Sequence, residues 1–135
     1  MLTLTPAHVT FAGQVWPDVA AISVDRRATR EVVEWSDAGP HVAFADCPEQ
    51  RIDITVTMHL TGRAHFDAPR PGQGGDLAFF PAPGGSDGGR IRISTQAVVL
   101  GIAHDLAGKK GALRTIRLIA VSPNGALDPI SIDQV

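Results

Sequence analysis

Residues 50–60 read QRIDITVTMHL, and polar and apolar side chains alternate along the whole stretch. A period of two is typical of a β-strand with one face in a core and the other toward water or a partner. A slip of one residue would bury charged side chains, so the register is firmly specified. One face receives Arg51, Asp53, Thr55, Thr57 and His59, and the other receives Ile52, Ile54, Val56, Met58 and Leu60. The stretch predicts an all-β protein with two-faced strands.

The same alternation recurs along the rest of the chain, and no convincing amphipathic helix interrupts it. We expect an antiparallel β-sandwich or barrel of about seven or eight strands, in one domain covering residues 1–135, with at most one short helix. Proline, glycine and aspartate mark the breaks between strands. The predicted strands are 8–15, 19–25, 30–35, 41–45, 50–60, 90–100 with an extension to 106, 112–121 and 128–132, and the main turns are 16–18, 36–40, 46–49, 107–111 and 122–125.

Residues 61–89, TGRAHFDAPRPGQGGDLAFFPAPGGSDGG, differ in character because glycine and proline punctuate them. We expect a long loop or arm here, with one short apolar piece at 77–80 and one helical turn near 63–66. A loop above about 15 residues is uncommon in a compact domain and is usually functional or disordered. The expectation is that this segment becomes ordered only against a neighbouring subunit.

Composition excludes several classes of function. The chain has 135 residues, with 14 acidic against 12 basic side chains, so it lacks the basic excess that sequence-specific nucleic-acid binding requires. Cys47 is the single cysteine, and it offers no internal disulfide. The first residues do not form a signal peptide, and no apolar run approaches the roughly 18 residues of a membrane helix. We therefore expect synthesis in the cytoplasm and no membrane partner.

Residues with catalytic or metal-binding chemistry do not form a recognisable set. His59, His65 and His104 lack the matched spacing of zinc ligands. Ser94, His104 and Asp105 could supply a triad only by chance proximity, and no nucleophile-elbow motif accompanies them. The glycine runs do not match a phosphate-binding loop. The sequence predicts no enzyme activity, no cofactor and no metal.

Three pieces of the chain together resemble a known family. They are the early strand pair GQVWPDVAAISVDRRATREVVEWSD at 13–37, the strand at 50–60, and the C-terminal half from RIRISTQAVVL at 90 to DPISI at 132. Their order is similar to that of the tail tube proteins of long-tailed bacteriophages and gene-transfer particles. Those proteins usually carry a helix near mid-chain, and residues 61–89 depart from this pattern because proline and glycine disfavour a helix there.

The resemblance implies a virion structural protein whose partners are further copies of itself and other tail proteins. Six copies would close into a ring, and stacked rings would form the channel for DNA ejection, without sequence-specific binding of DNA. The implied polar lumen face consists of Arg51, Asp53, Thr55, Thr57, Arg92, Ser94 and Gln96. The candidate contacts between subunits are Arg26, Arg27, Arg30, Phe66, Phe79, Phe80, Lys109 and Lys110.

Two other interpretations stay open from the sequence. Another tail component, such as a distal tail, head–tail connector or baseplate ring protein, would form a single ring that does not stack. A monomeric β-sandwich binding module would stay a monomer at high concentration and would bind a ligand.

Overall fold

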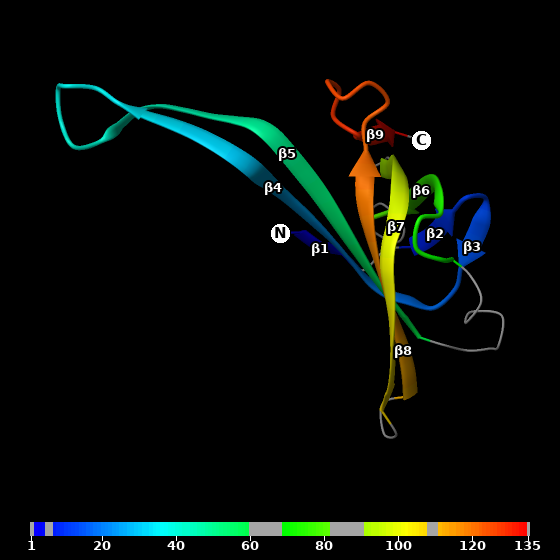
Figure 1. Cartoon of the computed structure of the whole chain (residues 1–135). Helices are drawn as coiled ribbons and strands as arrows, with labels where there is room; N and C mark the ends of the chain where they lie inside the picture. Colours follow the sequence, from blue (N-terminus) through cyan, green and yellow to red (C-terminus); the bar gives the residue numbers. More distant parts are fainter. Residues whose placement is uncertain (1, 5–6, 60–68, 82–90, 108–110, 135) are drawn as a thin grey trace.

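The computed structural model describes residues 2–4, 7–59, 69–81, 91–107 and 111–134, and these contain nine β-strands and no helix (Figure 1). The strand bounds are β1 Leu2–Leu4, β2 Ala7–Phe11, β3 Gln14–Trp16, β4 Val19–Trp35, β5 Val42–His59, β6 Gly74–Phe80, β7 Ile91–Ala107, β8 Gly111–Val121 and β9 Ile130–Gln134.

All nine strands belong to one antiparallel sheet in the order β1-β4-β5-β8-β7-β6-β2-β3. Strand β9 lies off this path and pairs with the first residues of β7, from Ile91 to Thr95, whereas β8 pairs with β7 from Gln96 onward. The all-β antiparallel class predicted from the sequence is confirmed. The sheet is open, since β1 and β3 are not paired with each other in the described residues.

One hydrophobic core holds the sheet together. Its members come from β2 and β3 at one end of the strand order and from β4 and β5 near the other, so the sheet curls over itself. The rings of Phe11 and Trp16 contact each other with their centroids 5.1 Å apart and their planes tilted by 39°. Each fully buried large apolar side chain contributes about 1.5–3 kcal/mol. The buried apolar side chains are Val9, Phe11, Trp16, Ile22, Ile52, Ile54, Val56, Met58, Leu77, Ala78, Phe79, Ala97, Val99, Ile116 and Leu118.

The inner half of β5 has the two faces predicted from residues 50–60. Ile54, Val56 and Met58 are buried, while Thr55 and Thr57 between them remain partly exposed. The ladder with β8 aligns Val56 with Ile116, so both apolar faces enter the same core. Leu60, the last residue of the predicted strand, lies outside the described residues.

Strands β4 and β5 are longer than predicted, and two predicted breaks are wrong. Arg26 and Arg27 continue β4, where an interruption of the strand was expected, and the predicted turn at 46–49 lies within β5. The two strands pair from Val19 to Trp35, with local register shifts. Each strand supplies the backbone hydrogen-bond partners of the other. The ladder therefore continues beyond the core, where polar and apolar side chains need not alternate.

Strand β6 corrects the prediction that residues 61–89 form one long loop or arm. It pairs with both β2 and β7 and places Leu77 and Phe79 in the core. Gly75 permits its close approach to the β2–β3 turn, since a Cβ there would lie 2.7 Å from the Cβ of Ala12. The helical turn predicted near 63–66 lies outside the described residues.

The predicted strand at 8–15 is a hairpin formed by β2 and β3. Ala12 and Gly13 have φ values of 52° and 82°, the left-handed backbone of a tight two-residue turn. The break predicted at 16–18 is confirmed, because β3 ends at Trp16 and β4 begins at Val19. Within it, Asp18 has φ 57° and its carbonyl accepts a hydrogen bond from the His59 N–H.

Candidate functional site

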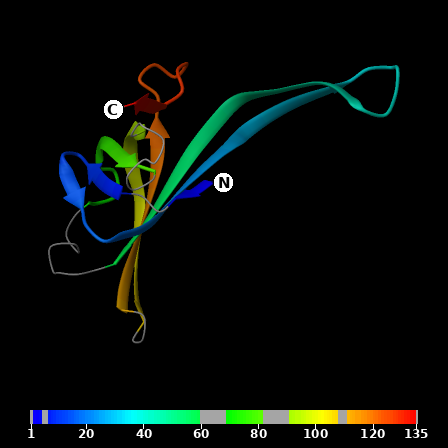
Figure 2. The ribbon, with the colours of Figure 1, turned by 180° about the vertical axis from the view of Figure 1, so that it is seen from behind.

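The most conspicuous feature of the molecule is the outer part of the β4–β5 hairpin. Figures 1 and 2 show it from opposite sides, running away from the other strands as a two-stranded ribbon. From Arg26 to Gln50, every residue except Val32 is exposed. We call residues 31–48 the distal arm.

Large apolar side chains lie exposed along the distal arm. Val33 is 41% exposed, Trp35 61%, Val42 47% and Phe44 52%. They are not confined to one side, because Val33 pairs with Ala45 whereas Phe44 belongs to the neighbouring pair with Glu34, on the opposite face. An isolated two-stranded hairpin is marginally stable in water. The distal arm therefore presents exposed apolar surface on both of its faces.

The hydrogen-bonding edges of the arm are also open in the described part of the chain. On the outer side of β4, β1 pairs only over residues 22–24. On the outer side of β5, β8 pairs only over residues 53–59. Beyond these points each strand presents unpaired N–H and C=O groups, which favour pairing with another strand.

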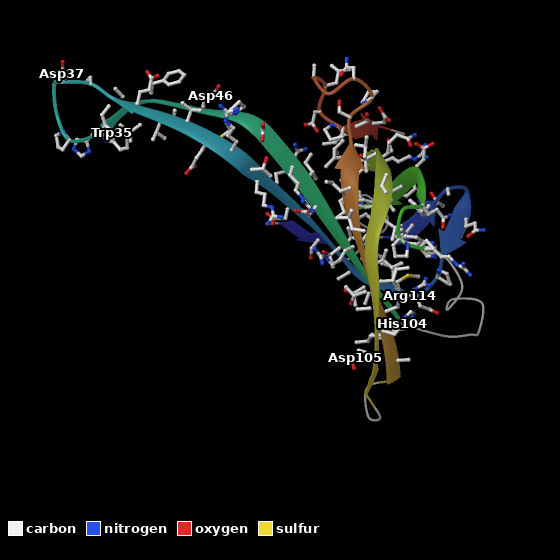
Figure 3. The ribbon with its side chains drawn as sticks, viewed as in Figure 1. Trp35, Asp37, Asp46, His104, Asp105 and Arg114 are labelled. Carbon is white, nitrogen blue, oxygen red and sulfur yellow. The ribbon has the colours of Figure 1, made fainter. Side chains whose placement is uncertain are left out.

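Charge divides the molecule into two unequal parts. The distal arm contains Glu31, Glu34, Asp37 and Asp46 and no Lys or Arg, so its net charge is −4. The remaining residues hold 10 acidic and all 12 basic side chains, for a net charge of +2. Figure 3 shows Trp35, Asp37 and Asp46 distributed along the arm, far from the labelled residues of the body. An acidic, partly apolar arm fits a surface that is apolar and basic.

The base of the arm is held by ion pairs within the chain. Arg26 contacts Asp128 at 3.0 Å, and Arg27 contacts Asp53 at 3.1 Å. Exposed pairs of this kind contribute little, about 0–1 kcal/mol each. Two further pairs, Arg30 with Glu49 at 3.9 Å and Arg51 with Asp53 at 2.8 Å, complete the set. The predicted contact residues Arg26, Arg27 and Arg30 thus already have partners in their own chain.

The contact with Asp128 links the arm to the turn at 122–129. The pKa of Asp128 lies below its ordinary value, mainly because its carboxylate accepts a hydrogen bond from the Ile130 N–H and secondarily because of Arg26. A groove of about 540 Å³ lies at this junction, with Ile52 and Leu127 among its lining residues.

The seven residues predicted as a polar face lie on the side of the sheet opposite the core. Cross-strand pairing aligns Asp53 with Ile119 of β8, and Ile119 with Val98 of β7. Gln96 lies on this same face of β7, two residues from Val98. The set at that face comprises Arg51, Asp53, Thr55 and Thr57 on β5 and Arg92, Ser94 and Gln96 on β7.

Apolar side chains lie between the polar residues of β5 and those of β7 on this face. The sequence did not predict this separation. Val98 and Ile119 are partly exposed, Leu100 is 41% exposed and Val121 is 42% exposed. Leu100 lies at a register shift, between the residues that pair with Leu118 and Arg117. We call Val98, Leu100, Arg117, Ile119 and Val121 the outer strip.

Arg114 is a buried residue that the sequence analysis missed. Its side chain is 1% exposed and its guanidinium donates to the Met58 Sδ at 3.2 Å. Burial lowers the pKa of Arg114 from its ordinary value. His104 is its cross-strand neighbour, and Figure 3 shows both near the crossing of β5 and β7. The signal was available, because residue 114 shares the inward-facing positions of β8 with Ile116.

The other predicted contact residues have different outcomes. Phe79 is 1% exposed and belongs to the core, so its prediction as a contact between subunits is wrong. Phe80 is partly buried at the end of β6. Phe66, Lys109 and Lys110 lie outside the described residues.

Within the described ranges, no three His, Cys, Asp or Glu side chains gather as a metal site would require. The same residues include no helix with the length and apolarity to cross a membrane. No protein-family model matches the chain, and no curated protein matches it either.

Proposed function

We propose that this protein is a structural subunit that assembles with copies of itself into stacked sixfold rings, as the tail tube of a long-tailed bacteriophage or gene-transfer particle. The observation that carries the proposal is the distal arm. Its residues are exposed except for Val32, it bears four large apolar side chains, and its strand edges are open in the described part of the chain. Such a ribbon is stabilised by strands and apolar surface from another chain.

In this tube the polar part of the outer face borders the channel. Its residues carry mixed charge, with Arg51 paired to Asp53 at 2.8 Å and the threonines Thr55 and Thr57 beside them. A surface of this kind binds a phosphate backbone only weakly, which suits DNA that has to move past it. Arg92, Ser94 and Gln96 extend the same surface. The protein is then synthesised in the host cytoplasm and resides in the virion tail, with other tail proteins at the tube ends.

Negative-stain electron microscopy of the purified chain at increasing concentration tests the proposal. We expect rings at low concentration and stacked rings or tubes at high concentration. Single rings that never stack would favour a connector or baseplate component instead. A monomer at every concentration, with a melting temperature that shifts on addition of a ligand, would favour a binding module and refute the proposal.

A further inference from the structure

The loop between β8 and β9, at the upper end of the sheet in Figure 1, contains Asn124, the single asparagine of the chain, and Gly125 follows it. Both residues are exposed. Asparagine is chemically labile, and a following glycine makes deamidation easier because no Cβ hinders the approach of its backbone nitrogen. We propose that Asn124 is a modification site of this protein, held in the unmodified amide form by the hydrogen bonds of its own turn. The proposal concerns the single chain and does not depend on self-assembly.

The reaction needs no partner other than water. The backbone nitrogen of Gly125 attacks the side-chain carbonyl carbon of Asn124, Cγ, and gives up its proton. A bond forms between Cγ and the backbone nitrogen, the bond from Cγ to the side-chain nitrogen breaks, and that nitrogen leaves as ammonia. Water then opens the cyclic imide at either carbonyl carbon, which gives aspartate or isoaspartate. One water is consumed and one ammonia is released, without oxidation or reduction.

The nucleophile of this reaction is engaged in the folded chain. The Gly125 N–H donates to the Ser122 Oγ at 3.0 Å, and the Ser122 hydroxyl donates to the Asn124 Oδ1 at 3.4 Å. The Gly125 nitrogen has to lose its proton, and with it this hydrogen bond, when it attacks Cγ. Ser122 therefore acts on both reacting groups and opposes their approach.

The electrophile is held as well. The Asn124 Oδ1 accepts hydrogen bonds from the backbone N–H groups of Ala126 and Leu127 at 2.9 and 3.0 Å. Bringing Cγ onto the Gly125 nitrogen requires the side chain to rotate, which loosens both bonds. Donors of this kind also polarise a carbonyl group. We infer that holding the side chain outweighs polarising it, and the rate of deamidation in the folded chain measures the balance.

The turn itself requires the labile pair. Gly125 has a φ of 82°, in the left-handed region where a side chain would add strain. Position 124 needs a short side chain with an acceptor for the two backbone N–H groups that it caps. Asparagine and glycine are therefore both favoured by the backbone of this loop, and the hydroxyl of Ser122 protects the pair from its own chemistry.

Modification would reach the base of the distal arm. Isoaspartate carries an extra methylene in the main chain, so residues 126–128 would shift. Asp128 accepts a hydrogen bond from the Ile130 N–H at 3.0 Å and contacts Arg26 at 3.0 Å. The isoaspartyl form should therefore lose the contact between this loop and β4. Aspartate keeps the ordinary backbone and an acceptor, so Asn124→Asp should retain that contact.

Mass spectrometry of the monomer stored in mildly alkaline buffer tests the inference on the tryptic peptide that follows Arg117. The folded wild type should deamidate about tenfold or more slowly than the chain unfolded in guanidinium chloride, because unfolding breaks all the hydrogen bonds of the turn. Ser122→Ala, shown to be folded by circular dichroism, should deamidate about 2- to 10-fold faster than the wild type, the equivalent of one neutral hydrogen bond. Ser122→Thr, which keeps the hydroxyl, should restore the slow rate. Ser131→Ala, at an exposed serine of β9 outside the turn, is the matched control and should leave the rate unchanged.

Three outcomes would overturn the inference. Deamidation as fast in the folded as in the unfolded wild type would show that the turn does not hold the amide, and this comparison decides even if Ser122→Ala does not fold. A folded Ser122→Ala variant with the wild-type rate would remove the hydroxyl from the protection. Equal acceleration by Ser131→Ala would show general loosening of the loop and not a role of Ser122. All of these results are measured on the monomer, so they are separate from failure of the proposed self-assembly.

Discussion

Excision of the outer hairpin should separate assembly from folding. The change replaces residues 29–49 with an Asn-Gly turn, joining the chain where Ala28 pairs with Gln50. On β4 the buried core member is Ile22, and on β5 the core begins at Ile52. No core residue is therefore removed. Asn-Gly is the preferred sequence for a two-residue hairpin turn.

The magnitude follows from what the excised residues contact. Apart from partly buried Val32, their large apolar side chains are already 41–61% exposed, and the lost pair of Arg30 with Glu49 contributes about 0–1 kcal/mol. We expect the free energy of unfolding to change by about 1 kcal/mol or less. By comparison Ile54→Ala, at a position 1% exposed, should cost about 2–5 kcal/mol because it leaves a cavity in the core.

Two assays are needed. Urea denaturation of monomeric protein measures stability, and light scattering of the native protein at high concentration measures assembly. The excised variant should unfold at nearly the wild-type urea concentration and should no longer assemble. Ile54→Ala should unfold at a clearly lower urea concentration and, in the absence of urea, should still assemble. The reasoning would be refuted if excision destabilised the body as much as Ile54→Ala does, or if the excised variant still formed rings.

Three further predictions concern the body. Gly75→Ala should cost about 1–3 kcal/mol of unfolding free energy, since the new Cβ would lie 2.7 Å from the Cβ of Ala12. Gly39→Ala, with open space around it, should be nearly neutral. Thermal melts of the two variants measure the difference. Val56→Asp, at 0% exposure, should prevent folding, while Thr55→Asp on the opposite face should leave the circular dichroism spectrum of the native fold. The pKa of Asp128 is lowered in the folded protein, so its contribution to stability is present above its ordinary pKa of 3.8 and is lost as the pH falls through the lower folded value. The difference in unfolding free energy between wild type and Asp128→Asn should therefore disappear in acid. A difference that grows in acid would contradict the assignment.

The elements predicted well are those in which burial alternates along the strand. From Ile52 to Met58, buried and partly exposed side chains alternate because one face of β5 enters the core. The alternation of apolar and polar residues in the sequence indicates this directly. The outer part of the same hairpin has no core to face, so its residues follow no period. The charged residues Arg26 and Arg27 therefore predict a break, but the two strands satisfy each other's backbone hydrogen bonds there.

Composition misled the prediction in one other place. Glycine and proline around residues 61–89 indicated a loop, but Gly74 and Gly75 lie inside β6, where a side chain at Gly75 would collide with the β2–β3 turn. The sequence alone does not distinguish a glycine that permits close approach of two strands from a glycine in a loop. Only the position of the neighbouring strand distinguishes them. The candidate site was hidden for a similar reason, since exposed Trp35 and Phe44 look like core residues until their surroundings are known.

Sedimentation velocity of the wild-type chain over a wide concentration range tests the central claim most directly, because it measures association without a surface, a stain or a mutation. Self-assembly through the arm predicts a sedimentation coefficient that rises with concentration and reaches values of closed rings and their stacks. A single species of 14.2 kDa at every concentration would contradict it.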